Sequence, residues 1–444
     1  LEHIDRLTEI FNVCWPMYAA MPAVLKKAVL RAYEKCGWDL FTSTNKYGMK
    51  AYPSFVDLLL ELETAIKESA YSEEVKGNYT GSLVTRVESL TNGLNGAIFS
   101  AIEIPDEVLF DQNTIIDLSR IGSQETKSLI MGLLVMQLNE YRMVNATQAN
   151  NNLRHITVLE EAHNILQRTS TEQSMEGSNV AGKSVEMLIN SIAEMRTYGE
   201  GFIIVDQSPT SVHASAIKNT NTKIIMRLPD GEDRLIAGKA AALKDDQVDE
   251  IAKLPTGVAI VYQNDWLQPV MCKVSMSQTK REKYVKKEDR SQVTSNELPI
   301  AELLKLLFKG RLRNPVEPRI DGIENALANA GLSTAFRLEL LSLISEYKKT
   351  GKLKLWSDDN FASLSNLTAR LLNLEKPVKE AVSKAVTFED LNKMLSELLK
   401  DVKDLPASMN LILKQALMRN YGEDNLEQLK IYNAWLQDIK KIML

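Results

Sequence analysis

The chain has 444 residues, of which 44% are hydrophobic and 25% are charged, which is the composition of an ordinary globular protein with two or three domains. Its formal net charge of −5 argues against a protein that binds nucleic acid through a uniformly basic surface, but it is compatible with a locally basic pore. No apolar run approaches the roughly 18 residues of a membrane span, and the three cysteines lack metal-ligand spacing, so we expect a cytoplasmic protein with no membrane partner.

Apolar side chains recur at helical spacing through the first 110 residues. The pattern is clearest in Leu25–Tyr33, Phe55–Ile66 and Leu83–Leu90. The Trp and Tyr residues of this region are more simply explained as packing residues than as ligand contacts. We therefore predict that residues 1–110 are mostly helical.

Short apolar runs then recur along the chain, and each is followed abruptly by polar residues. They lie at Asn113–Ser119, Ile156–Leu159, Gly201–Pro209 and Asn221–Pro229. Segments with helical spacing precede or follow these runs. Alternating strands and helices predict a parallel, doubly wound α/β sheet.

Two adjacent carboxylates, Glu160 and Glu161, directly follow the run Ile156–Leu159. Ligands of open α/β sheets bind at the carboxyl ends of the strands, so chemistry is expected at this edge. Paired acids there suit nucleotide hydrolysis: one would hold Mg²⁺, directly or through water, and the other would polarise the attacking water. The alternative is an acidic surface turn. The functional interpretation is favoured because an apolar strand rarely ends in two like charges without a cation nearby.

The later segments are predicted to complete this core and to add a second domain. Val258–Tyr262 and Pro269–Val274 flank a polar turn and predict a hairpin that finishes a core at residues 111–277. Residues 278–297 are strongly polar and predict a linker or a solvated helix. Amphipathic runs in residues 298–444 predict an all-α C-terminal domain that docks a partner or trims an oligomer.

Four stretches, taken in order, resemble the HerA-type ATPases, which are RecA-like motor proteins of the HerA and FtsK group. The stretches are TIIDLSRIGSQETKSLIMGLL, ITVLEEAHNIL, SIAEMRTYGEGFIIVDQSP and NTKIIMRLPD. Each is short, but together they are specific, and the resemblance extends over roughly residues 1–275. It implies a P-loop NTPase core in which residues 1–110 are a helical insertion and the strand before Glu160 is the Walker B strand.

The resemblance implies an enzyme that uses ATP and Mg²⁺, forms a hexameric ring and moves double-stranded DNA, often beside a nuclease or another effector. It implies that Glu160 holds the Mg²⁺ and that Glu161 polarises the lytic water, and it adds two further site residues. Gln207 would hydrogen-bond the γ-phosphate or the lytic water, whereas the alternative is a turn residue before Pro209. Arg196 would contact a γ-phosphate in its own subunit or the next, whereas the alternative is a surface salt bridge with Glu194 or Glu200.

Two features depart from the family pattern. The family's phosphate-binding loop should lie upstream of these strands. This chain begins at Leu1 with a helical region, so we expect the first nucleotide-binding strand and its loop to be absent. The metal-binding position, usually Asp in the family, is Glu160, and its extra methylene favours water-mediated contact.

One later stretch, Gly177–Ser184, literally fits the G-x-x-x-x-G-K-S pattern of a phosphate-binding loop. Such a loop needs a strand before it and a helix after it, so that backbone N–H groups converge on the anion. The match instead follows a polar run, Arg168–Glu176, and comes after the acidic strand. We interpret it as a loop and a helix N-terminus, with no phosphate role for Lys183.

The sequence thus predicts an α/β fold: a RecA-like parallel sheet flanked by helices, with a helical insertion and a C-terminal all-α domain. We interpret the chain as the C-terminal part of a HerA-like, ATP-driven, ring-forming DNA translocase or helicase. As given, it is expected to be inactive. The competing hypothesis is a non-hydrolysing scaffold that retains the fold as a docking platform for DNA or a partner.

Overall fold

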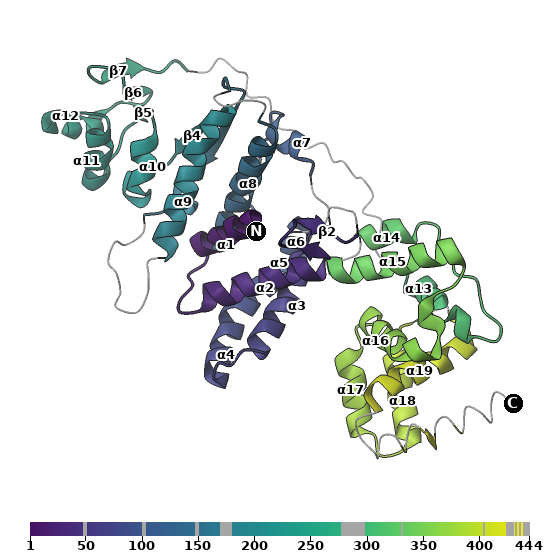
Figure 1. The fold of residues 1–444 in the computed structure, drawn as a ribbon. Helices are drawn as coiled ribbons and strands as arrows, with labels where there is room; N and C mark the ends of the chain where they lie inside the picture. Colours follow the sequence, from purple (N-terminus) through teal and green to yellow (C-terminus); the bar gives the residue numbers. More distant parts are fainter. Residues whose placement is uncertain are drawn as a thin grey trace. The chain divides into compact units, whose positions relative to one another are not determined.

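The computed structural model describes residues 1–47, 51–99, 104–146, 151–168, 180–276, 298–329, 332–402 and 405–422, with 430, 433, 434 and 437. The chain divides into two compact units (Figure 1). Unit 1 contains most of residues 1–288, and unit 2 contains residues 289–444 with short segments from the first unit's part of the chain, among them Tyr52–Val56. No helix among the residues described is long and apolar enough to cross a membrane.

The first part of unit 1 is helical, as predicted. Apolar side chains at helical spacing form its core, and Phe11, Leu25, Leu62 and Leu83 are fully buried. A short hairpin with two residues in each strand, which the sequence did not predict, lies between the second and third helices. The elements are α1 (Glu2–Cys14), α2 (Met21–Lys35), β1 (Trp38–Asp39), β2 (Thr44–Asn45), α3 (Phe55–Lys67), α4 (Glu73–Tyr79), α5 (Thr85–Thr91), α6 (Gly93–Ile98) and α7 (Asp106–Phe110).

A parallel strand pair and two long helices follow. They are α8 (Gln124–Val144), β3 (His155–Glu160), α9 (Val180–Glu194) and β4 (Glu200–Val205). β3 and β4 pair in parallel from His155 opposite Glu200 to Glu160 opposite Val205, as the two apolar runs predicted. The helices α8 and α9 lie side by side, and α1 packs against both of them (Figure 1).

The run Asn113–Ser119 is not a strand, so that expectation was wrong. Residues 113–118 have no strand partner among the residues described, and Ile115 is 95% exposed. A run of β-branched residues has a high strand propensity, but it forms a strand only where a neighbouring strand is present to hydrogen-bond with its backbone. Here local bonds shape the segment instead: Thr114 Oγ1 donates to Val108 O, and Ser119 N donates to the Asp117 carboxylate.

A separate antiparallel sheet with its own helices completes unit 1. The predicted hairpin is confirmed as β6 paired with β7. The run Asn221–Pro229 was expected to form a strand of the parallel sheet. Its strand, β5, instead hydrogen-bonds to β6 of that hairpin, and the two strands are antiparallel. A small core that includes Ile225, Ile251 and Ile260 holds this part together. The elements are α10 (Ala214–Asn219), β5 (Thr222–Ile225), α11 (Gly231–Ala240), α12 (Asp245–Glu250), β6 (Val258–Gln263) and β7 (Val270–Lys273).

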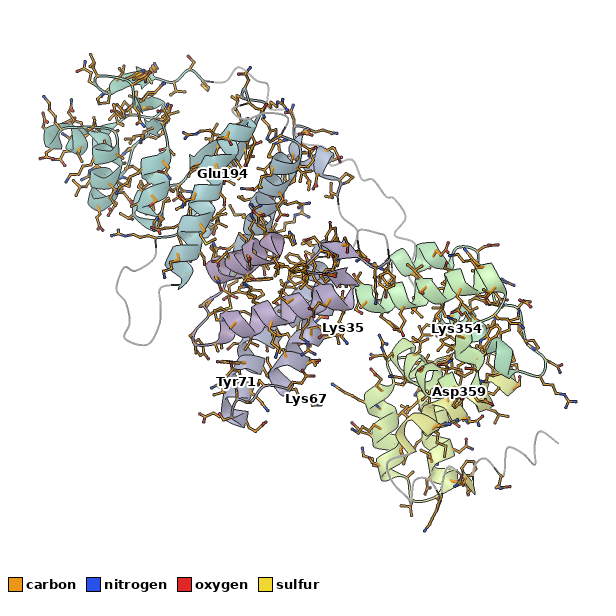
Figure 2. All side chains as sticks on the ribbon, in the orientation of Figure 1. Lys35, Lys67, Tyr71, Glu194, Lys354 and Asp359 are labelled. Carbon is orange, nitrogen blue, oxygen red and sulfur yellow. The ribbon has the colours of Figure 1, made fainter. Side chains whose placement is uncertain are left out.

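Unit 2 is helical in its described residues and has one apolar core, as predicted. Phe308, Leu340, Leu364 and Leu413 are among its buried members. The side chains of both units are drawn in Figure 2. The predicted linker 278–297 lies outside the described residues. The helices are α13 (Ile300–Phe308), α14 (Ile323–Asn329), α15 (Thr334–Thr350), α16 (Phe361–Leu371), α17 (Glu375–Lys384), α18 (Phe388–Leu398) and α19 (Ala407–Gly422).

The predicted fold class is confirmed in its main features. A small parallel sheet is flanked by helices, a helical region precedes it, and an all-α unit follows it. Only the pair β3–β4 is parallel among the residues described. The described parallel sheet is therefore smaller than the predicted one.

Candidate functional site

Three of the four predicted site residues meet at one edge of the parallel sheet. Glu160 is the last residue of β3, Glu161 follows it, and Gln207 lies two residues beyond the end of β4. Because β3 and β4 are parallel neighbours, their carboxyl ends coincide. Gln207 Nε2 donates a hydrogen bond of 2.8 Å to Glu161 Oε1. The two side chains predicted to handle the lytic water are therefore in direct contact.

The backbone of Glu161 adopts a left-handed conformation with φ 51° and ψ 49°. This region is uncommon for residues other than glycine and costs on the order of 1–3 kcal/mol. The turn Ala162–Asn164 maintains it, because the backbone N–H of Asn164 (3.0 Å) and its side-chain Nδ2 (2.7 Å) both donate to Glu161 O. The Glu161 side chain remains 49% exposed, so its carboxylate is open to a ligand.

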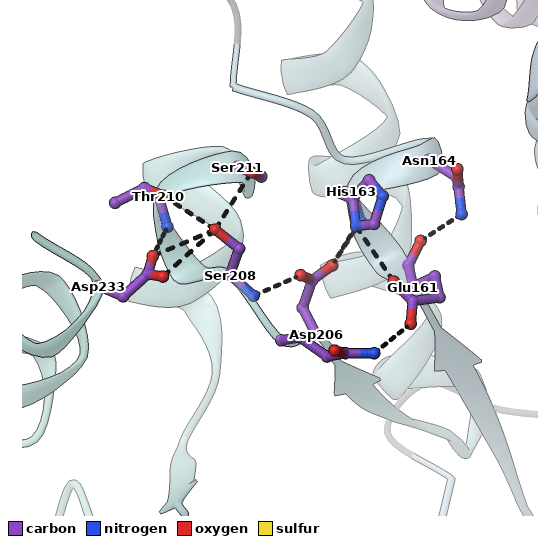
Figure 3. A network of polar contacts seen from close by, with 9 residues as sticks. Glu161, His163, Asn164, Asp206, Ser208, Thr210, Ser211 and Asp233 are labelled. Carbon is purple, nitrogen blue, oxygen red and sulfur yellow. Dashed lines mark hydrogen bonds and ion pairs between the residues drawn. The ribbon is translucent and has the colours of Figure 1, made fainter. Parts of the chain in front are cut away.

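The nearly buried carboxylate of Asp206 holds His163 beside Glu161 (Figure 3). Asp206 is 7% exposed, and its Oδ2 accepts from the backbone N–H of His163 at 2.8 Å and lies 2.9 Å from His163 Nδ1. His163 Nδ1 lies 3.7 Å from Glu161 Oε2. Asp206 thus fixes a group that borders Glu161. The sequence reasoning passed over Asp206, although an acid directly before Gln207 was the available signal.

The same network extends to α11. Ser208 N donates to Asp206 Oδ1 at 3.0 Å, and Ser208 Oγ donates to Asp233 Oδ1 at 3.2 Å. Asp233, in the first turn of α11, also accepts from Thr210 N at 2.8 Å. These bonds tie the end of β4 to the helix that packs on the antiparallel sheet (Figure 3). The geometry of the segment around Gln207 therefore depends on α11.

Glu160 has the chemistry expected of a metal-binding side chain. It is exposed, and within the described residues no hydrogen bond or ion pair occupies its carboxylate. The described residues contain no group of three or more His, Cys, Asp or Glu side chains that would enclose a metal ion. Mg²⁺ is commonly held by one or two carboxylates, with waters and phosphate oxygens as its other ligands. Glu160 and Glu161 fit that requirement.

The structure does not bring Arg196 to this edge. Arg196 lies in the turn Met195–Tyr198, which precedes β4, whereas Gln207 follows β4. The six residues of β4 separate the two edges by about 20 Å at ~3.3 Å per residue. The alternative salt bridge is not formed either, because within the described residues Glu200 pairs with Arg142 and His155, and Glu194 accepts from Tyr198. Arg196 itself is exposed.

The pattern match Gly177–Ser184 lies partly outside the described residues. Val180 begins α9, and Lys183 is an exposed residue in the first turn of this helix. Ser184, in contrast, is buried and donates from its hydroxyl to the Glu9 carboxylate on α1. The serine of the pattern therefore has a packing role.

Replacement of Lys183 by alanine is expected to leave ATP affinity within about threefold, a change below ~1 kcal/mol. The side chain is exposed on a helix that no described strand directly precedes, so no described segment supplies a phosphate cradle for it. Isothermal titration of ATP into the two proteins measures the difference. A large loss of binding would mean that Gly177–Ser184 is a phosphate loop.

The candidate site is an open edge and not an enclosed pocket. A cavity of about 390 Å³ lies between α1, the start of α8 and the segment after β3, and Asn164, which donates to Glu161 O, lines it. Its walls include Asn12, Gln124, Asn164 and Gln167, and none of the four predicted site residues lines it. This cavity would therefore not enclose a ligand bound at Glu161 and Gln207.

Comparison with known sequences gives matches to HerA helicases, although no family model matches the chain. The DNA double-strand break repair helicase HerA of Sulfurisphaera tokodaii is 22% identical over 225 residues, which cover 50% of this chain and 42% of that protein. The HerA of Sulfolobus acidocaldarius is 22% identical over 218 residues, which cover 48% and 41%. The probable HerA of Methanocaldococcus jannaschii is 34% identical over 80 residues, which cover 18% and 16%.

Solved structures give weaker similarity. VirB4 of Thermoanaerobacter pseudethanolicus aligns with a TM-score of 0.44 and 14% identity over 62% of this chain and 70% of that chain. The genome packaging NTPase of Sulfolobus turreted icosahedral virus 2, in complex with sulfate, aligns with a TM-score of 0.25 and 10% identity over 39% and 78%. TM-scores of this size do not by themselves establish a common fold.

The sequence matches carry the assignment. In the two longest of them, the matched region spans about two fifths of the length of each HerA helicase and about half of this chain. By these matches the chain resembles the HerA helicases over about half of its length.

Proposed function

We propose that this chain forms part of an ATP-driven DNA translocase or helicase of the HerA type. The observation that carries the proposal is the 2.8 Å bond between Gln207 and Glu161 at the shared carboxyl edge of β3 and β4. Glu161 polarises the lytic water, and Gln207 orients that water or the γ-phosphate. Glu160 holds Mg²⁺, which when bound neutralises charge on the phosphates.

A further strand and phosphate-binding loop complete this site in the proposal. β4 pairs only with β3 among the residues described, so its other edge has unpaired backbone groups. One face of the pair is apolar and open, with Val158 53% and Ile203 49% exposed on adjacent strands. Parallel sheets are normally covered on both faces. These features support an additional strand and helix, supplied by polypeptide other than the described residues.

The assembly and its partners also belong to the proposal. Arg196 is exposed and without an ion pair among the residues described, which suits contact with the nucleotide of an adjacent subunit. A hexameric ring around double-stranded DNA would create that contact, and a nuclease or other effector would act beside it. The proposed location is the cytoplasm.

A non-hydrolysing scaffold is the second candidate. It is favoured by one observation: the described residues contain no strand, glycine-rich loop and helix beside Glu161 that would cradle phosphates. Glu160 would hold Mg²⁺ but would supply no backbone N–H groups to hold the phosphates, so it cannot replace that cradle. In this case the fold would serve as a docking platform for DNA or a partner protein.

Phosphate release by two proteins separates the candidates. Residues 1–444 are expected to hydrolyse no ATP above background, with or without duplex DNA. A longer protein that includes the upstream segment of the reading frame, with a strand and a Gly-Lys-Ser/Thr loop, is expected to hydrolyse ATP faster when duplex DNA is added and to form a ring by light scattering. Inactivity of the longer protein with DNA and its partner present would favour the scaffold.

A further inference from the structure

Unit 2 has a charge balance opposite to that of the chain as a whole. Residues 298–422 contain 19 Lys and Arg against 15 Asp and Glu, a net +4, in a chain with a total of −5. The excess is concentrated in two short segments. Lys309–Arg319 and Lys348–Lys354 together contain eight basic residues and one acidic residue, Glu317.

The two segments form one surface. Lys309 Nζ donates to Tyr347 Oη at 2.6 Å, and Arg311 Nη2 donates to Ser357 O at 2.6 Å. Trp356 Nε1 donates to Leu307 O at 3.0 Å, and its ring lies so close to Gly310 that a Cβ there would collide with it. Contacts just before, within and after the two segments therefore hold them together. We call the exposed cations on them the basic surface: Arg313, Arg319, Lys349, Lys352 and Lys354.

Ion pairs do not neutralise the basic surface. Four nearby acids pair with other cations: Glu302 with Lys305, Glu317 with Lys309, Asp358 with Arg311, and Glu324 with Lys348. The Glu302 carboxylate also accepts from the backbone N–H of Arg319 at 2.6 Å. Among the described residues, the five members of the basic surface have no ion pair. Three acids near the surface have no ion pair among the described residues: the exposed Asp321 and Asp359, and Glu346, whose Oε1 accepts from Lys354 N at 3.1 Å. Asp359 is labelled in Figure 2 together with Lys354. The surface therefore keeps an excess of positive charge.

Helix stability explains only part of this charge. Basic residues in the last turn of a helix interact favourably with its dipole, which accounts for Lys348 and Lys349 at the end of α15. Lys352 and Lys354 lie beyond the helix, after Gly351 has ended it, and Arg313 lies in another loop. Like charges brought together at an exposed surface repel unless a polyanion neutralises them.

We propose that the basic surface of unit 2 binds the phosphodiester backbone of duplex DNA. Exposed lysines contact phosphates as point charges and do not distinguish bases, so the binding is independent of sequence. This suits a motor that must move along any DNA, and the inference rests on the proposed function for that reason. The binding itself needs no nucleotide, because every member lies outside unit 1.

Fluorescence anisotropy with a labelled duplex of mixed sequence tests the proposal on residues 1–444 without ATP. The test variant replaces Lys349, Lys352 and Lys354 by alanine. The matched control replaces Lys376, Lys379 and Lys393, which are exposed lysines on α17 and α18 of the same unit. Both variants lose three positive charges, so a difference in DNA affinity between them reflects where the lysines lie and not the total charge of the protein. Circular dichroism checks that both are folded.

The test variant is expected to bind DNA about tenfold or more weakly at ~100 mM salt. Each lost phosphate contact should also reduce the slope of log affinity against log salt by ~0.9, or about 2–3 for three lysines. The control is expected to stay within about twofold of the unchanged protein. Equal weakening in both variants, equal affinity in the test variant and the unchanged protein, or no DNA binding by the unchanged protein would each overturn the proposal.

The result is separable from the test of ATP hydrolysis. If the test variant alone loses DNA binding but the longer protein hydrolyses no ATP, the basic surface binds DNA and the motor function is wrong. If the longer protein shows DNA-stimulated hydrolysis that is unchanged by the triple replacement, the motor function holds and DNA contact lies elsewhere.

Discussion

Replacement of Glu161 by glutamine is expected to lower ATP turnover by a factor on the order of 10²–10⁴ in a protein that includes the phosphate-binding segment. Glutamine has nearly the same shape, and its amide oxygen can still accept the bond from Gln207, which is 2.8 Å long in the present structure. It cannot act as a base toward the lytic water. ATP affinity should therefore be almost unchanged, because the loss affects the transition state and not ground-state binding.

Glu186 provides the matched control for this experiment. It is an exposed glutamate on α9 of the same unit, so Glu186→Gln removes one charge without affecting the sheet edge. Steady-state phosphate release gives turnover, and titration with a non-hydrolysable ATP analogue gives affinity. Near-normal turnover of Glu161→Gln would show that Glu161 does not act as the base toward the lytic water. A parallel loss of nucleotide affinity would assign Glu161 to binding instead.

The position of Glu161 and Gln207 was predictable because both signals are local. Continuous apolar runs that end abruptly in polar residues predict buried parallel strands with a polar carboxyl edge. The structure confirms the parallel pair β3–β4 and puts the two side chains in contact. The left-handed backbone of Glu161 was not predictable, because Asn164 maintains it through two bonds that no residue pattern indicates.

The rest of the site depends on contacts between distant residues. Asp206 reaches His163 across 43 positions, and Ser208 reaches Asp233 across 25. Periodicity reports which face of an element is apolar and carries no information on such pairs. The false strand at Asn113–Ser119 has the related cause that propensity does not say whether a partner strand is present.

The hairpin β1–β2 was missed because its turn is polar and carries no strand signal. The Asp39 carboxylate builds it by accepting from the backbone N–H of Phe41 at 2.8 Å and of Thr42 at 3.1 Å. These two bonds favour the ionised form and hold the pKa of Asp39 below its usual range. Side chains of this type commonly organise turns, but a single Asp among polar residues is a weak signal in a sequence.

The edge of the sheet opposite the candidate site is held by a buried charge cluster. The Glu200 side chain is fully buried and accepts from Arg142 Nε at 2.9 Å and from Thr157 Oγ1 at 2.6 Å, and it lies 2.8 Å from His155 Nδ1. Arg142 also donates to Asp111 at 2.6 Å. That bond, together with the bond from Tyr141, holds the pKa of Asp111 below its usual range. The contribution of Asp111 to the free energy of unfolding is therefore fully present above pH ~4 and is lost as the pH falls through the lowered pKa of Asp111.

Replacement of Glu200 by alanine is expected to destabilise unit 1 by about 3–5 kcal/mol, because it leaves Arg142, whose side chain is only 11% exposed, without its main buried partner. Urea-dependent hydrogen exchange at the amides of β3 and β4, measured near pH 7, reports this unit separately from unit 2. Glu73→Ala is the control, since it breaks an exposed pair with Lys76 and should cost less than ~1 kcal/mol. Equal costs for the two variants would mean that Arg142 relaxes toward Asp111 and solvent, and that the cluster does not fix the edge of the sheet.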